Sequence, residues 1–332
     1  MSRGFPNPSG WGVKLITAMA LLVMIPVSRV DLAWTVWLRQ HRIPALTRFL
    51  DRTLFEGEGL GGGDPVIILL LLIAVAYYLA WKQVLRRHLL AWRPQLGFVL
   101  TTAVVCGIYL VHGLKWVLGR ARPLLVFAEK ALPFSDWYRF GPHFVSEGIF
   151  RGSFPSGHTV QAFLVMTFAY LLAGDNSRSP WRTTAGWLWG ALSIVYALVM
   201  GMGRCMAYSH WVSDVLGGLF LAWICMHLLF YRVLQVPMQM RYWRTFQEHP
   251  PLPTVWELRL CGYLLAVVLG LMGATIGTRA LVLWQAPALG GLIPLGLVLG
   301  TLGARSAGHL LATVGNTYAE GLGGSAGGSG YH

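Results

Sequence analysis

The sequence predicts an all-α protein, a bundle of helices that crosses a membrane several times. Three observations predict it: 55% of the 332 residues are hydrophobic, only 12% are charged, and the mean hydropathy is +0.56. A soluble domain carries about twice that share of charge, so this chain has too little polar material to cover a water-exposed surface. Long unbroken apolar runs favour membrane helices, because a helix satisfies its own backbone hydrogen bonds in lipid.

A crossing needs about 20 apolar residues, and the apolar runs of this chain meet that length repeatedly. The expected spans lie at residues 13–30, 65–81, 95–117, 157–173, 185–206, 211–233, 259–279 and 284–304. Several tryptophans fall close to these ends, where an amphipathic ring prefers the interface: Trp81, Trp116, Trp211, Trp256 and Trp284. The first run lacks a clean cleavage site after it, so we interpret it as an uncleaved helix.

The segments between the spans divide the chain further. Residues 31–64 are polar, aromatic and mixed in charge, which favours a short helix lying in the membrane interface. A core that carries the chemistry is expected over residues 1–235, followed by a proline-containing linker at 236–258. Two additional spans are expected within 259–304, and the Gly/Ser-rich end of the chain predicts a flexible tail over 305–332.

Two glycine pairs have the GxxxG spacing that lets helix backbones approach closely: Gly186 with Gly190, and Gly296 with Gly300. Such pairs are compatible with a contact inside one chain and with a face between copies of it, so a homo-oligomer stays open. Glycine is also common in membrane helices, and that alone would account for the pairs equally well.

The chain has 26 Lys+Arg against 13 Asp+Glu, a net charge of +13. In a membrane protein, basic residues flank the spans and meet anionic headgroups, so we expect membrane lipids as partners and no nucleic acid. The short loop at 82–95 carries four basic residues and no acid, which predicts a cytoplasmic location for it and for the N-terminus. The long loop at 118–155 then faces outward.

Three short segments concentrate groups that suit phosphate chemistry. They are Lys115-Trp-Val-Leu-Gly-Arg-Ala-Arg122-Pro123, Phe154-Pro155-Ser156-Gly157-His158, and Gly203-Arg204-Cys-Met-Ala-Tyr-Ser-His210-Trp-Val-Ser-Asp214. If the spans alternate in direction, the end of the third span, the start of the fourth and the turn between the fifth and sixth all reach one side of the membrane. Three cations and two histidines are therefore expected to converge.

Each member of this set has a chemical use. Lys115, Arg122 and Arg204 supply fixed positive charge, and the arginine fork matches phosphate oxygens. Ser156 and Gly157 open a helix whose free N–H groups suit an anion.

His210 and Asp214 are four residues apart, so on a helix they share a face. The carboxylate can hold one ring nitrogen and leave the other to attack as a nucleophile, with His158 as general acid. The sequence shows no carboxylate cluster for magnesium, so we expect no metal and no other cofactor, and electrostatic stabilisation falls to the cations.

These motifs, in this order and spacing over roughly residues 65–235, resemble the three signatures of the type 2 phosphatidic acid phosphatases, the PAP2 superfamily. The resemblance implies a six-helix core, here with about two extra C-terminal spans, and a metal-independent reaction through a phosphohistidine. It implies His210 as nucleophile, Asp214 as its partner and His158 as general acid. The phosphate-binding residues that it implies are Lys115, Arg122, Ser156, Gly157 and Arg204. Gly203 departs from the family pattern, which usually has serine there.

The function expected from this resemblance is an integral membrane phosphatase acting on a lipid phosphate or pyrophosphate. A phosphotransferase, which passes the phosphoryl group to another lipid such as lipid A, would use the same residues. A transporter or scaffold that only binds phospholipid would not need His210 and Asp214 together. Isoprenoid pyrophosphate, phosphatidylglycerol phosphate, phosphatidate and lipid A all fit as substrates, and we expect a bacterial inner membrane with the site facing the periplasm or outside.

Overall fold

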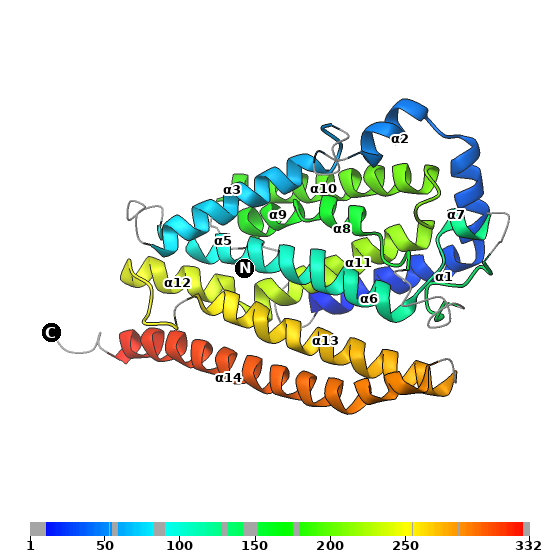
Figure 1. The fold of residues 1–332 in the computed structure, drawn as a ribbon. Helices are drawn as coiled ribbons and strands as arrows, with labels where there is room; N and C mark the ends of the chain where they lie inside the picture. The colour runs from blue at the N-terminus through cyan, green and yellow to red at the C-terminus, as the bar shows by residue number, and fades with distance from the viewer. Residues whose placement is uncertain are drawn as a thin grey trace.

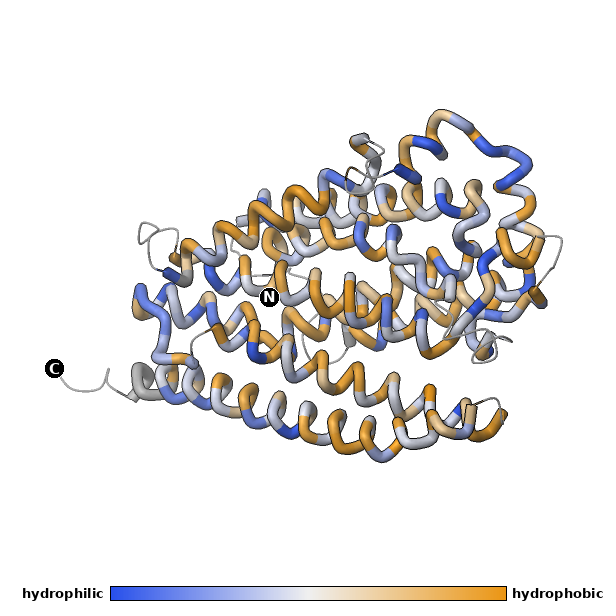
Figure 2. Tube along the Cα trace, viewed as in Figure 1, coloured by the Kyte–Doolittle hydropathy of each residue, from blue (hydrophilic) through white to orange (hydrophobic). Residues whose placement is uncertain are grey.

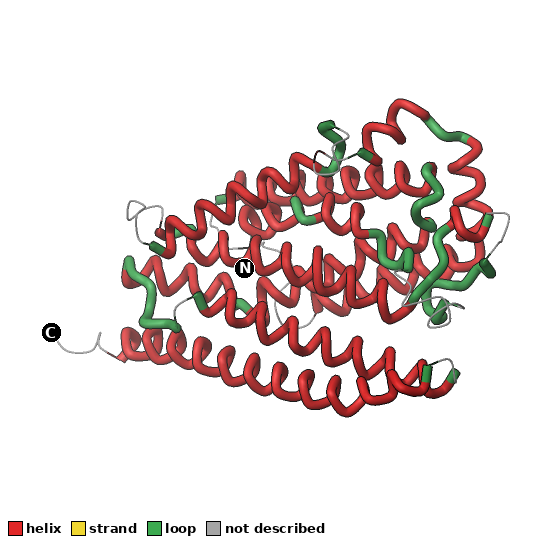
Figure 3. Tube along the Cα trace, viewed as in Figure 1, coloured by secondary structure: helices red, strands yellow, loops and turns green. Residues whose placement is uncertain are grey.

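A computed structural model of the chain consists of helices packed roughly side by side along one long direction, and no strand occurs in its described part (Figures 1 and 3). It describes residues 11–52, 54, 59–82, 90–127, 132–141, 152–174, 179–253, 255–283 and 286–327. The predicted all-helical membrane bundle is confirmed. Apolar residues run along most helices, and hydrophilic ones are more frequent at helix ends and in connections (Figure 2).

The elements follow one another as the apolar runs predict. The first half of the chain forms α1 (Trp11–Gln40), α2 (Pro44–Asp51), α3 (Asp64–Trp81), α5 (Arg93–Thr102), the π-helical η2 (Ala103–Leu110), α6 (Val111–Leu118), α7 (Pro123–Val126), α8 (Gly157–Phe163) and α9 (Met166–Ala173). The second half forms α10 (Pro180–Met206), α11 (Val212–Leu228), the π-helical η3 (Leu229–Val233), α12 (Val236–Phe246), α13 (Trp256–Val282), the 3-10 helix η4 (Pro287–Gly291) and α14 (Leu292–Gly327).

Each predicted span corresponds to helix in the described residues, but the spans differ in length. Among the described residues, six helical stretches are long and apolar enough to cross a membrane, at residues 12–40, 93–126, 180–206, 212–246, 256–282 and 287–322. The two others, residues 64–80 and 157–173, are shorter apolar helices. The predicted span at 157–173 is interrupted by a turn between α8 and α9, where the Thr167 hydroxyl donates to the Leu164 carbonyl (2.7 Å).

The N-terminal region differs from the prediction in one respect. Helix α1 continues to Gln40 rather than ending near residue 30, because its polar residues find partners inside the bundle. Asp31 is 1% exposed and Thr35 is 0% exposed. The short helix predicted within 31–64 is present as α2, which begins with Pro44 at its first position, where proline costs no hydrogen bond.

The C-terminal region also differs from the prediction. The expected linker at 236–258 contains α12, and the expected flexible tail is helical to Gly327, with residues 328–332 outside the described part. The prediction of a flexible tail rested on glycine and serine content. It did not take account of a buried stripe of Leu310, Val314 and Tyr318, which packs this part of α14 onto the bundle. The Tyr318 hydroxyl donates to Gln239 Oε1 on α12 (3.2 Å).

Helices α13 and α14 form a closely packed antiparallel pair at one edge of the bundle (Figure 1), and α13 packs on α5, η2 and α6. Glycines allow the close approach. A Cβ at Gly270 would lie 2.5 Å from the Gly296 carbonyl oxygen, and one at Gly296 would lie 2.4 Å from that of Gly270. The pair Gly296 and Gly300 therefore forms a helix contact inside the chain.

The two glycines of this pair differ in how tightly they are enclosed. A Cβ at Gly300 would meet its nearest neighbour at an ordinary 3.7 Å. We expect Gly296→Ala to lower the free energy of unfolding by about 1–3 kcal/mol through overpacking. Gly300→Ala should be neutral or stabilising by about 0.5–1 kcal/mol, since alanine is the better helix former. Unfolding in mixed micelles with increasing SDS measures both, and equal effects would contradict the packing.

Candidate active site

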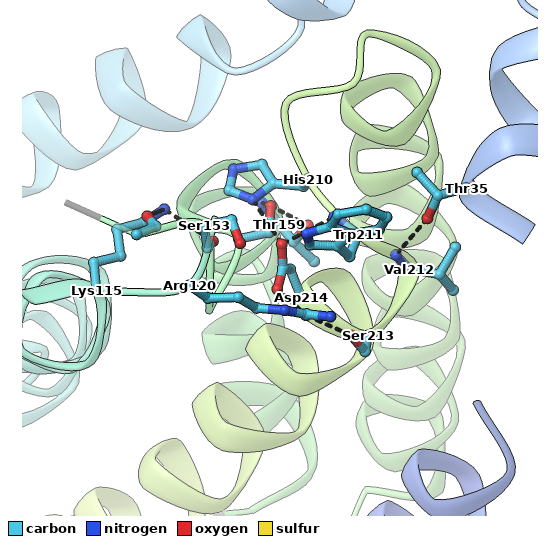
Figure 4. Close-up of polar contacts among 12 residues, drawn as sticks. Thr35, Lys115, Arg120, Ser153, Thr159, His210, Trp211, Val212, Ser213 and Asp214 are labelled. Carbon is cyan, nitrogen blue, oxygen red and sulfur yellow. Dashed lines mark hydrogen bonds and ion pairs between the residues drawn. The ribbon is translucent and has the colours of Figure 1, made fainter. Parts of the chain in front are cut away.

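The three chemistry-bearing segments meet at one end of the bundle, and backbone hydrogen bonds join them directly (Figures 1 and 4). The Gly152 amide donates to the Lys115 carbonyl (3.0 Å), which ties the chain before α8 to the end of α6. The Ser156 amide donates to the Asp214 carbonyl (2.9 Å), which ties the start of α8 to the start of α11. Residues about a hundred positions apart in the chain thus share one site.

His210 and Asp214 face one another across the first turn of α11. His210 lies in the turn between α10 and α11, and its Nδ1 is 3.4 Å from Asp214 Oδ2. The same carboxylate oxygen accepts from the Trp211 amide (2.9 Å). Both side chains are almost completely buried, at 2% and 0% exposed. The imidazole and the carboxylate therefore meet, but His210 lies in the turn before α11 and not on a helix face as the i, i+4 spacing predicted.

The pKa of His210 is lowered from 6.5 to about 3, chiefly by burial, which disfavours the charged form. The hydrogen bond with Asp214 acts in the opposite direction, while the positive charges of Lys115 and Arg204 lower the pKa as well. The imidazole is therefore neutral at pH 7. A neutral imidazole held by a carboxylate keeps one nitrogen lone pair for attack.

Lys115 and Ser156 lie close to this pair. The Lys115 ammonium is 2% exposed and donates to the carbonyls of Gly152 (3.3 Å) and Ser153 (3.1 Å). Ser156 caps α8, where its Oγ accepts from the Thr159 amide (3.4 Å) and from the Thr159 hydroxyl (2.9 Å).

The remaining predicted residues also lie at this end of the bundle. Gly157 and His158 begin α8 and are half-buried. Arg122 is half-buried at the start of α7, and the next residue but one, Leu124, donates its amide to the Tyr208 carbonyl (3.0 Å) in the turn that holds His210.

Arg204 has a partner that the sequence did not predict. Its Nη1 forms an ion pair with Asp51 at the end of α2, and its buried Nε has no hydrogen-bond partner among the described residues. Asp51 is 49% exposed. Gly203 is explained by the same helix, because a Cβ there would lie 2.4 Å from Leu50 Cδ1. Glycine at 203 leaves room for α2 to reach Arg204.

Arg120 and Asp31 are site residues that sequence reasoning missed. Arg120 is 1% exposed and forms ion pairs with Asp214 (Nη1–Oδ1, 2.6 Å) and with Asp31 on α1 (Nη2–Oδ2, 2.8 Å). It also donates to the Ser213 hydroxyl (2.7 Å) (Figure 4), and Asp31 accepts from the Ser213 amide (2.9 Å). The sequence carried little signal for Asp31, because the predicted span ended at residue 30; only the extension of α1 to Gln40 places this acid inside the bundle, where it needs a partner.

This buried network predicts a stability effect. Asp31→Asn leaves Arg120 with one carboxylate instead of two, and breaking a buried pair by removing one partner costs about 3–5 kcal/mol. We expect a loss towards the lower end of that range, because Asp214 still pairs with Arg120. Thermal unfolding in detergent, together with SDS titration, measures the change.

A matched control is available at an exposed ion pair. Asp136 lies 3.6 Å from Arg139, whose side chain is 68% exposed. Asp136→Asn should change the free energy of unfolding by at most about 1 kcal/mol, since exposed pairs contribute little. Equal effects of the two variants would show that the buried pair contributes no more than a surface one.

Comparison with known proteins gives a family match and a partial relative. Residues 95–237 match the family model described as "PAP2 superfamily". A curated relative, "Lipid A 1-phosphatase" of Porphyromonas gingivalis, is 40% identical over 81 residues, which are 24% of this chain and 16% of that protein. No solved structure matches the chain.

Proposed function

From the match of residues 95–237 to the PAP2 superfamily model, we propose that the protein is a member of this family and an integral membrane phosphatase that releases phosphate from a lipid. The observation that carries this proposal is a neutral, buried His210 held by Asp214, with Lys115 and Arg204 close enough to affect its charge. That combination supplies a nucleophile and an anion site together.

The proposed reaction has two steps. His210 Nε2 attacks phosphorus, so that an N–P bond forms, while the bond from phosphorus to the lipid oxygen breaks and His158 gives that oxygen a proton. Water then attacks the phosphohistidine, His158 takes a proton from it, and inorganic phosphate leaves as His210 is restored. Asp214 keeps the imidazole oriented in both steps.

In this proposal Lys115, Arg122 and Arg204 neutralise the charge that gathers on the phosphoryl oxygens, and Ser156 and Gly157 complete the phosphate site. The carboxylate of Asp51 occupies Arg204 without substrate, so a phosphate would displace it. Arg120 and Asp31 act as positioning residues, because they hold Asp214 rather than the reacting atoms. The reaction needs no metal in this scheme, and phosphate release should survive EDTA.

His210→Ala should reduce phosphate release by at least roughly 10³-fold, because the nucleophile is lost. The measurement is inorganic phosphate released from a panel of lipids in detergent: lipid A, an isoprenoid pyrophosphate, phosphatidylglycerol phosphate and phosphatidate. Release retained by the variant would refute the assigned nucleophile. The similarity to a lipid A 1-phosphatase supports lipid A as the first substrate to try.

The pH dependence follows from the lowered pKa of His210. The imidazole stays neutral between pH 7 and 5, because its pKa of about 3 lies below that window. Single-turnover phosphoenzyme formation at saturating substrate should therefore show no acid limb near pH 6.5. A tenfold fall per pH unit below 6.5 would mean that His210 titrates like an exposed histidine.

An apolar groove beside the site suits the lipid tail. It lies between α1, α10 and α11, has a volume of about 690 Å³, and includes Cys205 and Val212 on either side of the turn that holds His210. A smaller groove of about 330 Å³ lies nearer the start of α1, against α6 and α11. We assign the tail to the larger groove because it is bounded by the helices that carry Arg204, His210 and Asp214.

The two grooves allow a matched test on α1. Ala33 lines the larger groove and Ala20 the smaller one. Ala33→Trp should raise the KM for a long-chain lipid phosphate by about tenfold, the loss of one to two buried methylene contacts. Ala33→Trp should leave the KM for a short-chain soluble phosphate unchanged, and Ala20→Trp should change the KM of neither substrate. If Ala20→Trp instead raised the KM for the long-chain lipid and Ala33→Trp did not, the lipid tail would bind in the smaller groove.

We also propose that the site faces the outside of a bacterial inner membrane. The opposite end of the bundle carries a set of basic residues with Lys82 and Arg93 beside the short connection, and Arg232, Arg241 and Arg244 around α12. Basic residues favour the cytoplasmic side. Labelling of a cysteine introduced at exposed Tyr138, on intact spheroplasts with a membrane-impermeant reagent, tests the orientation.

A further inference from the structure

A cleft between α13 and α14 carries cations that the proposed reaction does not use. It has a volume of about 590 Å³ and is lined by Pro253, Arg259, Tyr263, Arg305, Ser306, His309, Leu310 and Thr313. We propose that this cleft binds the phosphate of an anionic membrane phospholipid. Two guanidinium groups, an imidazole and three hydroxyls are the donors that a phosphodiester headgroup takes.

Among the residues that the structure describes, no acidic side chain neutralises the charge of the cleft. Each of its two helices has one acid, and neither lines the cleft. Glu257 is buried on the side of α13 that faces α3, where it accepts from the Tyr77 hydroxyl (2.9 Å). Glu320 is 15 positions beyond Arg305, about 22 Å along the helix. Within the part of the chain that the structure describes, neither Arg259 nor Arg305 has an ion-pair partner.

The cleft lies where lipid phosphates would be. Arg259 and Arg279 on α13 are 20 residues apart, which is about 30 Å of helix, the thickness of the hydrocarbon layer. Arg279 marks the active-site end, where it donates to the carbonyls of Val117 (3.0 Å) and Gly141 (2.9 Å). Arg259 therefore marks the opposite boundary of the membrane.

Arg305 reaches the same level from α14. The nearby Gly303 packs against the Tyr263 backbone, since a Cβ there would lie 2.7 Å from the Tyr263 carbonyl oxygen. Beyond Arg305, α14 continues to Gly327 and packs against α12 through Tyr318. The helix thus leaves the hydrocarbon layer near Arg305, and a cation at that depth meets headgroups.

The surroundings favour a lipid over a soluble phosphate. Leu258, directly before Arg259, is 67% exposed, and Leu302, three residues before Arg305, is 56% exposed. Acyl chains would lie against such apolar side chains while the phosphate meets the arginines. Because the cleft is at the end of the bundle opposite His210, this inference does not rest on the proposed reaction.

The test is lipid retention by the full-length purified protein, measured by native mass spectrometry. Dioleoylphosphatidylglycerol is the probe, dioleoylphosphatidylcholine is the zwitterionic comparison, and inorganic phosphate is added in a separate arm. The double variant Arg259→Gln/Arg305→Gln should bind phosphatidylglycerol roughly 30-fold more weakly than the unmodified chain, at about a fivefold loss per basic residue. Arg241→Gln, which removes an exposed cation of α12 outside the cleft, should have little effect.

Three outcomes would overturn the proposal. The first is unchanged lipid retention in the double variant. The second is an equal loss of retention in Arg241→Gln, which would mean general anchoring at the interface. The third is displacement of the lipid by millimolar inorganic phosphate, which would mean a soluble ligand. Thermal unfolding checks that the double variant is folded. If it is not, the single variant Arg305→Gln replaces it, and its affinity for phosphatidylglycerol should fall by about fivefold. Loss of phosphatase activity in His210→Ala would leave all of these outcomes unchanged, so the two proposals fail separately.

Discussion

The positively charged guanidinium of Arg120 is buried in the bundle, where the residue is only 1% exposed, and two carboxylates from different helices neutralise its charge. Such a charge is tolerated only when it is paired and hydrogen-bonded, so the positions of α1, α11 and the segment after α6 are coupled. Asp214 takes part in this network with one oxygen and holds His210 and the Trp211 amide with the other. The proposed nucleophile is therefore oriented by contacts that reach α1, far from the reacting atoms.

The N-terminal helices contribute to the site although they lie outside the matched residues 95–237. Helix α1 supplies Asp31 and one wall of the apolar groove, and α2 supplies Asp51 to Arg204. The packing of Leu50 against Gly203 brings α2 close enough for that contact. These contacts come from residues outside the three sequence motifs, and they leave Arg204 paired with a carboxylate of the protein itself.

The two ends of the bundle are chemically different. One end holds paired and buried charges around His210, whose partners are supplied by the chain itself. The other end has the cleft of Arg259 and Arg305, whose partners the described protein does not supply. In a membrane, the first arrangement fixes the orientation of His210, whereas the arginines of the second would be neutralised by an anionic group from the bilayer. The paired helices α13 and α14 connect the two ends, because Arg279 binds carbonyls near the site and Arg259 lies at the far boundary.

The sequence by itself determined the membrane-bundle class, the place of nearly every helix and the set of motifs that resemble the PAP2 superfamily. Hydropathy and residue spacing are local properties, and a helix in lipid satisfies its own hydrogen bonds, so these features can be predicted without tertiary structure. The sequence also predicted that His210 and Asp214 meet, but it placed both on a helix, whereas His210 lies in the turn before α11. Only the tertiary structure decided that Arg120 pairs with Asp31 across about 90 residues, that Asp51 reaches Arg204, and that residues 305–322 of the expected tail form a helix packed through Tyr318. Those outcomes depend on which buried charges and rings meet, and partners so distant in the chain leave no periodic pattern to read.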